Sequence, residues 1–221
     1  MPLLIFDCDG VLVDSEYLFA VVARDCLAEI GIAMAPDEAA RRFAGVSIKD
    51  MLAEIERERG EPLPEGFFDD LVAREDDAYA RLLEPVPGVR EAILALDLPR
   101  CVASSSLPER ITASLIVTKL DDLFAEAARF SSVCVQNGKP APDIFWHAAK
   151  EMGERPENCI VVEDSVPGVT GAIAAGMKVI GFTGGRHCGE GHGGRLAAAG
   201  AGKVIASMAL LPDTARGFVR G

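Results

Sequence analysis

Positive charge is scarce in this chain. Its 221 residues include 22 Lys and Arg against 34 Asp and Glu, which gives a net charge of −12. Nucleic acids and anionic membrane surfaces are bound through clustered cations, so this balance disfavours both as partners. Nothing in the sequence specifies a protein partner. An anionic small molecule would need cations gathered locally at its site.

The chain also lacks a CxxC pair and a long apolar run. Its six cysteines are widely spaced, the usual pattern of reduced cytoplasmic thiols. The amino-terminal apolar run is short and meets an acid at Asp7, so it fits neither a signal peptide nor a membrane span. We therefore expect a cytoplasmic protein, long enough to bury a substantial core.

Short apolar runs alternate with helical patterns along most of the chain. Four of these runs have the composition of fully buried strands, at residues 3–6, 100–103, 160–162 and 179–182. Helix-like stretches follow most of them, and this order predicts an α/β fold with a doubly wound parallel sheet. In such a sheet, ligands bind beyond the carboxyl ends of the strands.

Residues 16–84 break the alternation, because they show helical periodicity and no convincing strand. A turn rich in Pro and Gly at residues 85–88 marks the return to the strand-helix pattern. We predict a helical cap at residues 16–85, inserted into a core formed by residues 1–15 and 86–221. An insertion directly after the first strand would lie over the end of that strand, as a lid does.

Acidic pairs follow two of the predicted strands. Asp7 and Asp9 come directly after the first strand, and Glu163 with Asp164 follows the run at 160–162. Acids this close repel one another unless a cation or a shared proton offsets their charge. Oxygens from two such strand ends, together with water and a phosphate, would satisfy the octahedral preference of Mg²⁺. An Asx-type turn at Asp7 and a helix cap at Asp164 are the structural alternatives.

Phosphate donors are predicted at two further places. Ser104, Ser105 and Ser106 follow the apolar run at 100–103 and offer hydroxyl and backbone N–H groups, before a helix that would begin near Pro108. Lys139 lies between Gly and Pro ahead of another helix. Most single lysines are solvated surface charges, but an anion site in so acidic a chain requires a cation.

A Gly-rich segment at residues 184–194 is typical of a flexible surface loop. His187, Cys188 and His192 fall inside it and could be taken for a metal cluster. Spacing within a Gly-rich loop gives no preorganised geometry, so we favour the loop interpretation.

Four segments together carry a family resemblance. They are FDCDGVLVDSE (6–16), VASSS (102–106), GKPAPDIF (138–145) and VVEDSVPGV (161–169). In this order they resemble the haloacid dehalogenase superfamily, in its phosphatase and β-phosphoglucomutase-like branch. Residues 145–177 further resemble bacterial sugar-phosphate phosphatases of the 6-phosphogluconate type. The resemblance implies a Rossmann-like core with an inserted helical cap, and hydrolysis of a small phosphate ester.

The resemblance also implies chemical roles. Asp7 would attack phosphorus and form an aspartyl-phosphate, which divides one hard hydrolysis into two easier steps. Asp9 would protonate the leaving oxygen and then activate water. Ser104 and Lys139 would hold the phosphoryl oxygens.

The same resemblance implies a Mg²⁺ site. Its ligands would be Asp7, the backbone carbonyl of Asp9, Asp164, and Glu163 either directly or through water. Gly45, Val46 and Ser47 would form a cap loop that reaches the substrate, with Gly45 permitting close approach.

Three other functions are weighed against a phosphatase. A mutase of the β-phosphoglucomutase type needs cap cations for a second phosphate, and this chain has Leu18, Ile48 and Glu75 at the corresponding positions. A dehalogenase generally lacks the second aspartate, whereas Asp9 is present, and a halide leaves without a proton. A non-catalytic phosphate-binding protein would be expected to have lost at least one of the catalytic residues.

Overall fold

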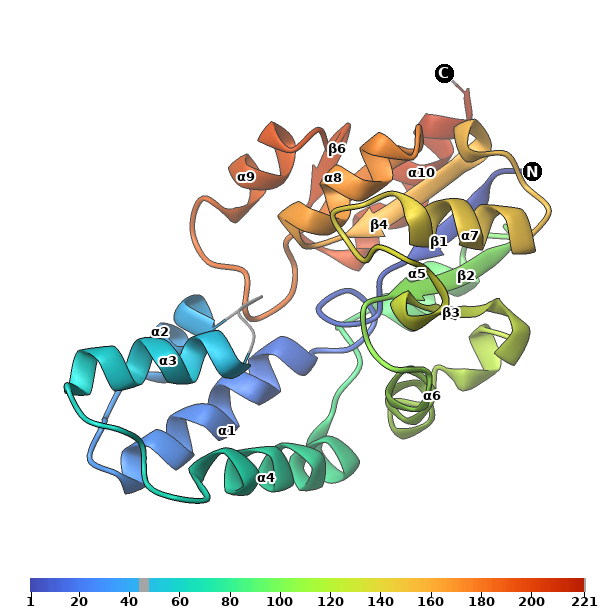
Figure 1. Cartoon of the computed structure of the whole chain (residues 1–221). Coiled ribbons are helices and arrows are strands. Elements are labelled where there is room, and N and C mark those ends of the chain that lie inside the picture. The colour runs from blue at the N-terminus through green and yellow to red at the C-terminus, as the bar shows by residue number, and fades with distance from the viewer. Residues whose placement is uncertain (44–47, 221) are drawn as a thin grey trace.

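The centre of the molecule is one parallel sheet (Figure 1). The structure is a computed structural model that describes residues 1–43 and 48–220. Six strands pair in the order β3-β2-β1-β4-β5-β6. They are β1 Leu3–Phe6, β2 Arg100–Ser104, β3 Arg129–Ser131, β4 Cys159–Glu163, β5 Lys178–Phe182 and β6 Lys203–Ile205. The predicted parallel, doubly wound α/β fold is confirmed, and two edge strands, β3 and β6, are added to the four predicted ones.

Helices cover both faces of this sheet. On one face lie α5 Val89–Leu94, α6 Pro108–Val117 and α10 Leu211–Arg220; on the other lie α7 Asp143–Glu151, α8 Val166–Ala174 and α9 His192–Ala198. Leu4 and Phe6 of β1 pack into the first layer, and Leu3 and Ile5 pack into the second. Because both faces are buried, the central strands are continuously apolar rather than alternating. This is why they can be recognised in the sequence.

Short 3-10 helices complete the connections around the sheet. They span Asp121–Leu123, Glu126–Ala128, Ser132–Cys134, Pro156–Asn158 and Met208–Leu210.

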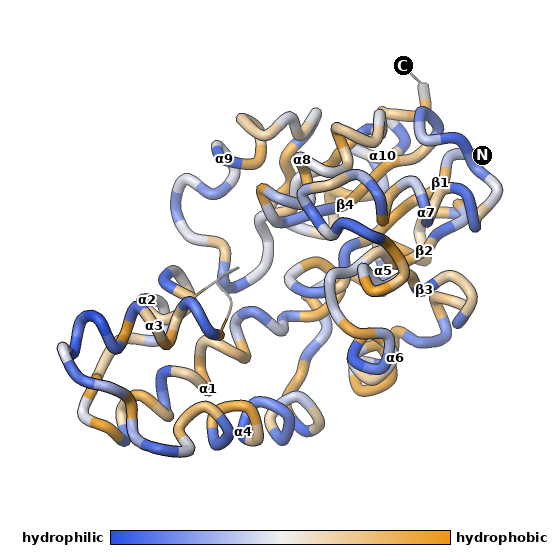
Figure 2. The backbone as a smooth tube through the Cα atoms, viewed as in Figure 1, coloured by the Kyte–Doolittle hydropathy of each residue, from blue (hydrophilic) through white to orange (hydrophobic). Residues whose placement is uncertain are grey.

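Four helices form a separate helical unit beyond the carboxyl ends of the strands (Figure 1). They are α1 Ser15–Glu29, α2 Pro36–Phe43, α3 Ile48–Arg59 and α4 Phe67–Leu82. Their apolar faces meet in an apolar cluster distinct from the two that flank the sheet, and Figure 2 shows hydrophilic residues along much of their outer surface. The predicted cap boundaries at residues 16–85 stay a prediction. Among the described residues, no helix is long and apolar enough to cross a membrane.

The two connections between the sheet and the helical unit run side by side. The Asp14 amide donates to the Glu84 carbonyl at 3.0 Å, and the Val86 amide donates to the Leu12 carbonyl at 2.9 Å. Arg186 adds side-chain ion pairs to both Asp14 and Glu84. The entry to and exit from the helical unit are therefore tied to each other and to the segment that follows β5.

Phe124 belongs to the apolar layer that contains Leu4 and Phe6 of β1, and its substitution tests the packing of that layer. Its ring is 1% exposed and meets Phe6 edge-on, with the ring centroids 5.8 Å apart. Phe124→Ala should lower the free energy of unfolding by about 3–5 kcal/mol, because it removes a buried aromatic ring and leaves a cavity. Phe68→Ala, at a ring 51% exposed, is the control and should change it by about 0.5 kcal/mol or less. Urea denaturation measures both, and equal losses would contradict this view of the core.

Candidate active site

Three polar side chains meet where neighbouring strands end. Asp7 follows β1, Ser104 ends β2 and Glu163 ends β4. Parallel pairing aligns Phe6 with Val102 and with Val162, so the following residues emerge at the same edge of the sheet. This edge faces the helical unit. The position is the one at which open α/β sheets bind ligands.

Lys139 lies between the two strand-end acids. Its Nζ atom donates to Asp7 Oδ1 at 2.8 Å, to Glu163 Oε1 at 2.6 Å and to the Ala103 carbonyl at 3.1 Å. The Lys139 side chain is 6% exposed and that of Glu163 is fully buried. A buried ammonium is tolerated only when it is paired and hydrogen-bonded in this way. The lysine predicted from the sequence therefore does lie beside Asp7.

Negative charge exceeds positive charge at this edge. Burial raises the pKa of Asp7 well above its usual value; Lys139 opposes the rise, while Glu163 and Asp164 add to it. Burial lowers the pKa of Lys139, but Asp7 and Glu163 outweigh it and hold the pKa above its usual value. Even with the imidazole of His187 bound to Asp164, two cationic side chains do not balance three carboxylates, so a further cation would stabilise the ionised Asp7.

The donor set fits a hard divalent cation. Carboxylate oxygens of Asp7, Glu163 and Asp164 lie within 4.8 Å of one another. Oxygen ligands of this kind are those that Mg²⁺ prefers. Glu163 is already engaged at both oxygens, because Oε1 accepts from Lys139 and Oε2 accepts from the Ser165 amide at 2.8 Å. Asp7 and Asp164 are therefore better disposed than Glu163 to bind a cation directly.

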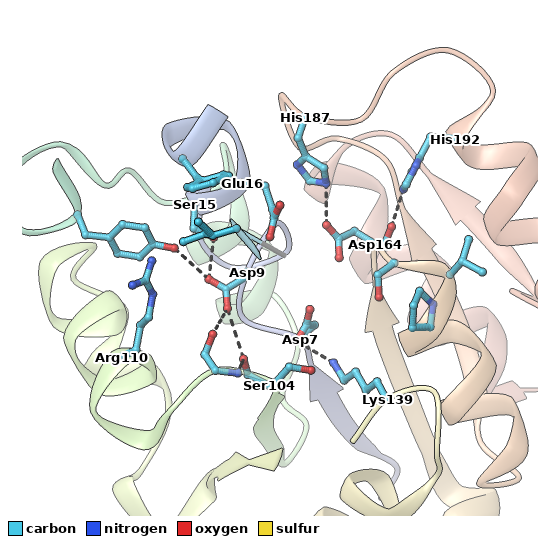
Figure 3. A pocket seen from close by; sticks show the side chains of 18 of the residues that line it. Asp7, Asp9, Ser15, Glu16, Ser104, Arg110, Lys139, Asp164, His187 and His192 are labelled. Carbon is cyan, nitrogen blue, oxygen red and sulfur yellow. Dashed lines mark hydrogen bonds and ion pairs between the residues drawn. The ribbon is translucent and has the colours of Figure 1, made fainter. Parts of the chain in front are cut away.

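Asp9 lies across the cavity from Lys139 and accepts several hydroxyl hydrogen bonds (Figure 3). Ser15 and Ser106 donate to its two carboxylate oxygens at 2.7 Å each, and Ser104 and Tyr79 donate at 3.4 Å. These donors come from α1, α4, the last residue of β2 and the segment that follows it. The carboxylate is thus oriented by both the sheet edge and the helical unit. Of these residues, the sequence analysis named only Ser104 and Ser106, and it predicted them as phosphate donors rather than as partners of Asp9.

Two histidines of the segment after β5 contact Asp164. His187 Nε2 is 2.8 Å from Asp164 Oδ2, and His192 Nε2 is 2.5 Å from the Asp164 carbonyl oxygen (Figure 3). Burial lowers the pKa of His187, but Asp164 and Cys188 together outweigh it and raise the pKa to about 11. His187 is 6% exposed. The prediction that the Gly-rich segment leaves its histidines without fixed geometry is therefore wrong.

Two glycines make room for the His187 ring. A Cβ atom on Gly10 would lie 1.9 Å from Asp164 Oδ2 and 2.8 Å from His187 Cε1. A Cβ on Gly185 would lie 2.6 Å from the same ring atom. Such approaches are too close for any side chain, so both positions require glycine. Gly10 also has φ of +76°, a backbone conformation that L residues rarely adopt.

The helical unit and α6 supply the wall opposite the histidines. Arg110 of α6 forms an ion pair with Glu75 of α4 and lies over the Tyr79 ring, 3.8 Å from its centroid. Glu75 is 7% exposed. Burial raises the pKa of Tyr79, and the neighbouring Asp9 adds to the rise, so this phenol stays protonated and can donate to Asp9. The pairing of Arg110 with Glu75 joins the helical unit to the core.

One cavity of about 640 Å³ connects these groups. Of the residues predicted from the sequence, it is lined by Asp7, Asp9, Ser104, Ser105, Lys139 and Asp164, and Glu163 lies buried behind Lys139. Gly45, Val46 and Ser47 lie outside the described residues. Lining residues that the sequence analysis did not assign to the site include Ser15, Tyr79, Arg110, His187, His192 and Arg195.

Gly10→Ala should destabilise the protein more than the same change at Gly176. Both residues have positive φ, +76° and +80°, but only the Gly10 position meets other atoms within 4 Å. We expect Gly176→Ala to lower the free energy of unfolding by about 1–2 kcal/mol through backbone strain. Gly10→Ala should lower it by about 1–3 kcal/mol more, because the Asp164 and His187 side chains must move. Equal losses on urea denaturation would show that the two side chains are not confined as described.

The sequence matches the family model of a haloacid dehalogenase-like hydrolase over residues 1–176. The 6-phosphogluconate phosphatase of Escherichia coli (strain K12) is 35% identical over 181 residues, which cover 80% of each chain. A haloacid dehalogenase-like protein of unknown function from Agrobacterium tumefaciens str. C58 is 40% identical, with a TM-score of 0.91 over 99% of each chain. A haloacid dehalogenase family hydrolase from Deinococcus radiodurans R1, solved with bound phosphate and sodium, is 31% identical, with a TM-score of 0.87 over 99% of this chain and 96% of that one. This chain belongs to the haloacid dehalogenase-like hydrolases.

Proposed function

We propose that this hydrolase is a Mg²⁺-dependent phosphatase of a small phosphorylated metabolite, a sugar phosphate, and that it acts through an aspartyl-phosphate on Asp7. The observation that carries the proposal is the convergence of Asp7, Lys139 and Asp164 at one sheet edge, with Asp9 across the same cavity. Phosphatase relatives such as the 6-phosphogluconate phosphatase support the reaction class. That the enzyme acts in the cytoplasm stays a prediction from its cysteine pattern.

In the first step, an Asp7 oxygen attacks phosphorus in line with the leaving group. A bond forms between that oxygen and phosphorus, the bond from phosphorus to the ester oxygen breaks, and Asp9 gives its proton to the departing alkoxide. Lys139, already 2.8 Å from Asp7, is close enough to neutralise charge on the phosphoryl oxygens, and Ser104 offers a hydroxyl to them. Glu163 keeps the ammonium of Lys139 in place.

In the second step, Asp9 acts as the base. It takes a proton from a water molecule, which attacks phosphorus and releases Asp7 and inorganic phosphate. Asp7 and Asp164 would hold Mg²⁺, together with the carbonyl of Asp9, and Glu163 would act through Lys139 or through water. Charge neutralisation at the phosphoryl oxygens is the chemistry that bound Mg²⁺ supplies.

The lining of the cavity favours a phosphatase over a mutase. Ile48 and Glu75, at two of the positions where a mutase would need cap cations, line the cavity and carry no positive charge. Arg110 is close to Glu75, but its guanidinium is already paired there. The second phosphate of a bisphosphate would therefore meet a carboxylate and an apolar side chain on this wall.

Phosphate release tests the nucleophile and the metal together. A panel of sugar and nucleotide phosphates, assayed with Mg²⁺ or with EDTA, should give Mg²⁺-dependent release. Asp7→Asn should reduce the rate by a factor on the order of 10³ or more, because the amide is a poor nucleophile. Asp97→Asn, the same change at an exposed position, is the matched control and should keep the wild-type rate. Release that survives Asp7→Asn would contradict the covalent mechanism, and the absence of release from every compound would favour a non-catalytic phosphate-binding protein.

Asp9→Asn separates the two steps. With a sugar phosphate, turnover should fall by about 10²–10⁴-fold, because the alkoxide leaves without a proton donor. With p-nitrophenyl phosphate, whose leaving group needs no proton, the variant should release about one equivalent of nitrophenol per site and then stall, since the second step lacks its base. Stopped-flow absorbance measures this burst. Near wild-type turnover of a sugar phosphate would show that the acid/base assignment is wrong.

A further inference from the structure

Three side chains with permanent positive charge line the described part of the cavity, and they differ in how they are paired. Lys139 is bound to Asp7 and Glu163. Arg110 is bound to Glu75, with Asp76 at 3.7 Å. Arg195 is the third, and among the described residues no carboxylate lies within ion-pair distance of it. Its charge is therefore available to a ligand.

Arg195 is held in place by a histidine rather than by a carboxylate. Its Nη2 donates to His192 Nδ1 at 2.8 Å, and His192 Nε2 lies 2.5 Å from the Asp164 carbonyl oxygen. Since Nδ1 accepts, Nε2 carries the proton and donates to that carbonyl. One imidazole ring thus separates the guanidinium from the strand end at Asp164. Figure 3 shows His192 reaching down to this strand end from the segment after β5.

This location lies beyond the phosphate-handling groups. Lys139 and Asp7 are at the floor of the cavity, whereas Arg195 is an exposed residue of α9 that also lines it. A substrate whose phosphate reaches Asp7 would extend its other end toward the mouth. Arginine recognises carboxylates and phosphates there through a planar fork of N–H donors.

The charges of the side chains that line the cavity favour a carboxylate over a second phosphate as the ligand of Arg195. The acids Asp7, Asp9, Glu16 and Asp164 also line the cavity, and the Arg195 guanidinium supplies a single positive charge. A carboxylate matches that charge, whereas a second phosphate brings nearly twice as much negative charge toward the same acids.

We infer that Arg195 binds a carboxylate at the end of the substrate opposite the phosphate, and that the substrate class is a phosphorylated sugar acid. This inference rests on the proposed phosphatase function and deepens it. His192 acts as the positioning residue of the guanidinium. Arg195 lies outside residues 1–176, the stretch matched by the family model, so the subsite belongs to the carboxy-terminal segment of this chain.

The contribution of the carboxylate to recognition is measured with two six-carbon phosphate esters that differ at the end opposite the phosphate. 6-Phosphogluconate ends in a carboxylate where sorbitol 6-phosphate ends in a hydroxymethyl group. Wild-type protein should have a kcat/KM for 6-phosphogluconate about tenfold or more above that for sorbitol 6-phosphate. Arg195→Gln should remove this preference by lowering only the 6-phosphogluconate value, and Arg195→Lys should keep part of it.

Arg155→Gln is the matched charge control. Arg155 is exposed and forms an ion pair with Glu157 at 3.5 Å. It precedes β4 and so lies at the amino end of that strand, away from the candidate site at its carboxyl end. It should leave both kcat/KM values unchanged. An equal loss on both substrates with Arg195→Gln, or no loss on either, would overturn the carboxylate subsite.

Calorimetry separates this inference from the proposed function. Dissociation constants for both compounds are measured with Mg²⁺ in Asp7→Asn and in Asp7→Asn/Arg195→Gln, in which turnover is expected to be slower by a factor on the order of 10³ or more. Selective weakening of 6-phosphogluconate binding by about tenfold supports the subsite, even if wild-type protein hydrolyses neither compound and the proposed function fails. Binding of 6-phosphogluconate that is indifferent to Arg195 overturns the subsite, even if hydrolysis is observed.

Discussion

The ion pairs of Lys139 with Asp7 and Glu163 organise the carboxyl end of the sheet, where the candidate active site lies. The lysine comes from the segment before α7, and the two acids come from the ends of β1 and β4, so one ammonium joins three separate parts of the core. The position of the Glu163 side chain requires glycine at position 168, since a Cβ atom on Gly168 would lie 1.6 Å from Glu163 Oε1. The surplus of negative charge that the ammonium leaves is what makes a divalent cation fit the site.

Around that fixed centre, the groups that line the rest of the cavity come from more distant parts of the chain. Tyr79, Glu75 and Arg110 form one wall, and His192 with Arg195 forms another. The first wall is shared between α4 and α6, and the second is carried by the segment after β5. In the proposed mechanism, chemistry and recognition are thus built on different elements, the first on strand ends and the second on helices and on a Gly-rich connection.

Sequence analysis predicts the central strands and the polar residues at their ends well, and the residues that form the cavity walls poorly, for physical reasons. The four central strands are apolar because both faces are buried, whereas β3 and β6 are edge strands of only three residues, too short to give an apolar run. Asp7, Ser104 and Asp164 follow recognisable strands, so their meeting can be deduced from parallel pairing alone. Tyr79 is 70 residues from Asp9, and its contact depends on the path of the helical unit. His187 was misjudged because flanking glycines suggest mobility, although here Gly10 and Gly185 are the glycines that admit its ring.

The side-by-side connections to the helical unit have a consequence for how such a protein can diverge. Asp14 and Glu84 are 70 residues apart in sequence and hydrogen-bonded to each other, so the intervening segment begins and ends at one point. Lengthening, exchanging or deleting it would leave the strand ends of the core where they are. Selection can therefore act on this segment as a replaceable module, and new substrate preferences can arise without rebuilding the apparatus that breaks the phosphate ester.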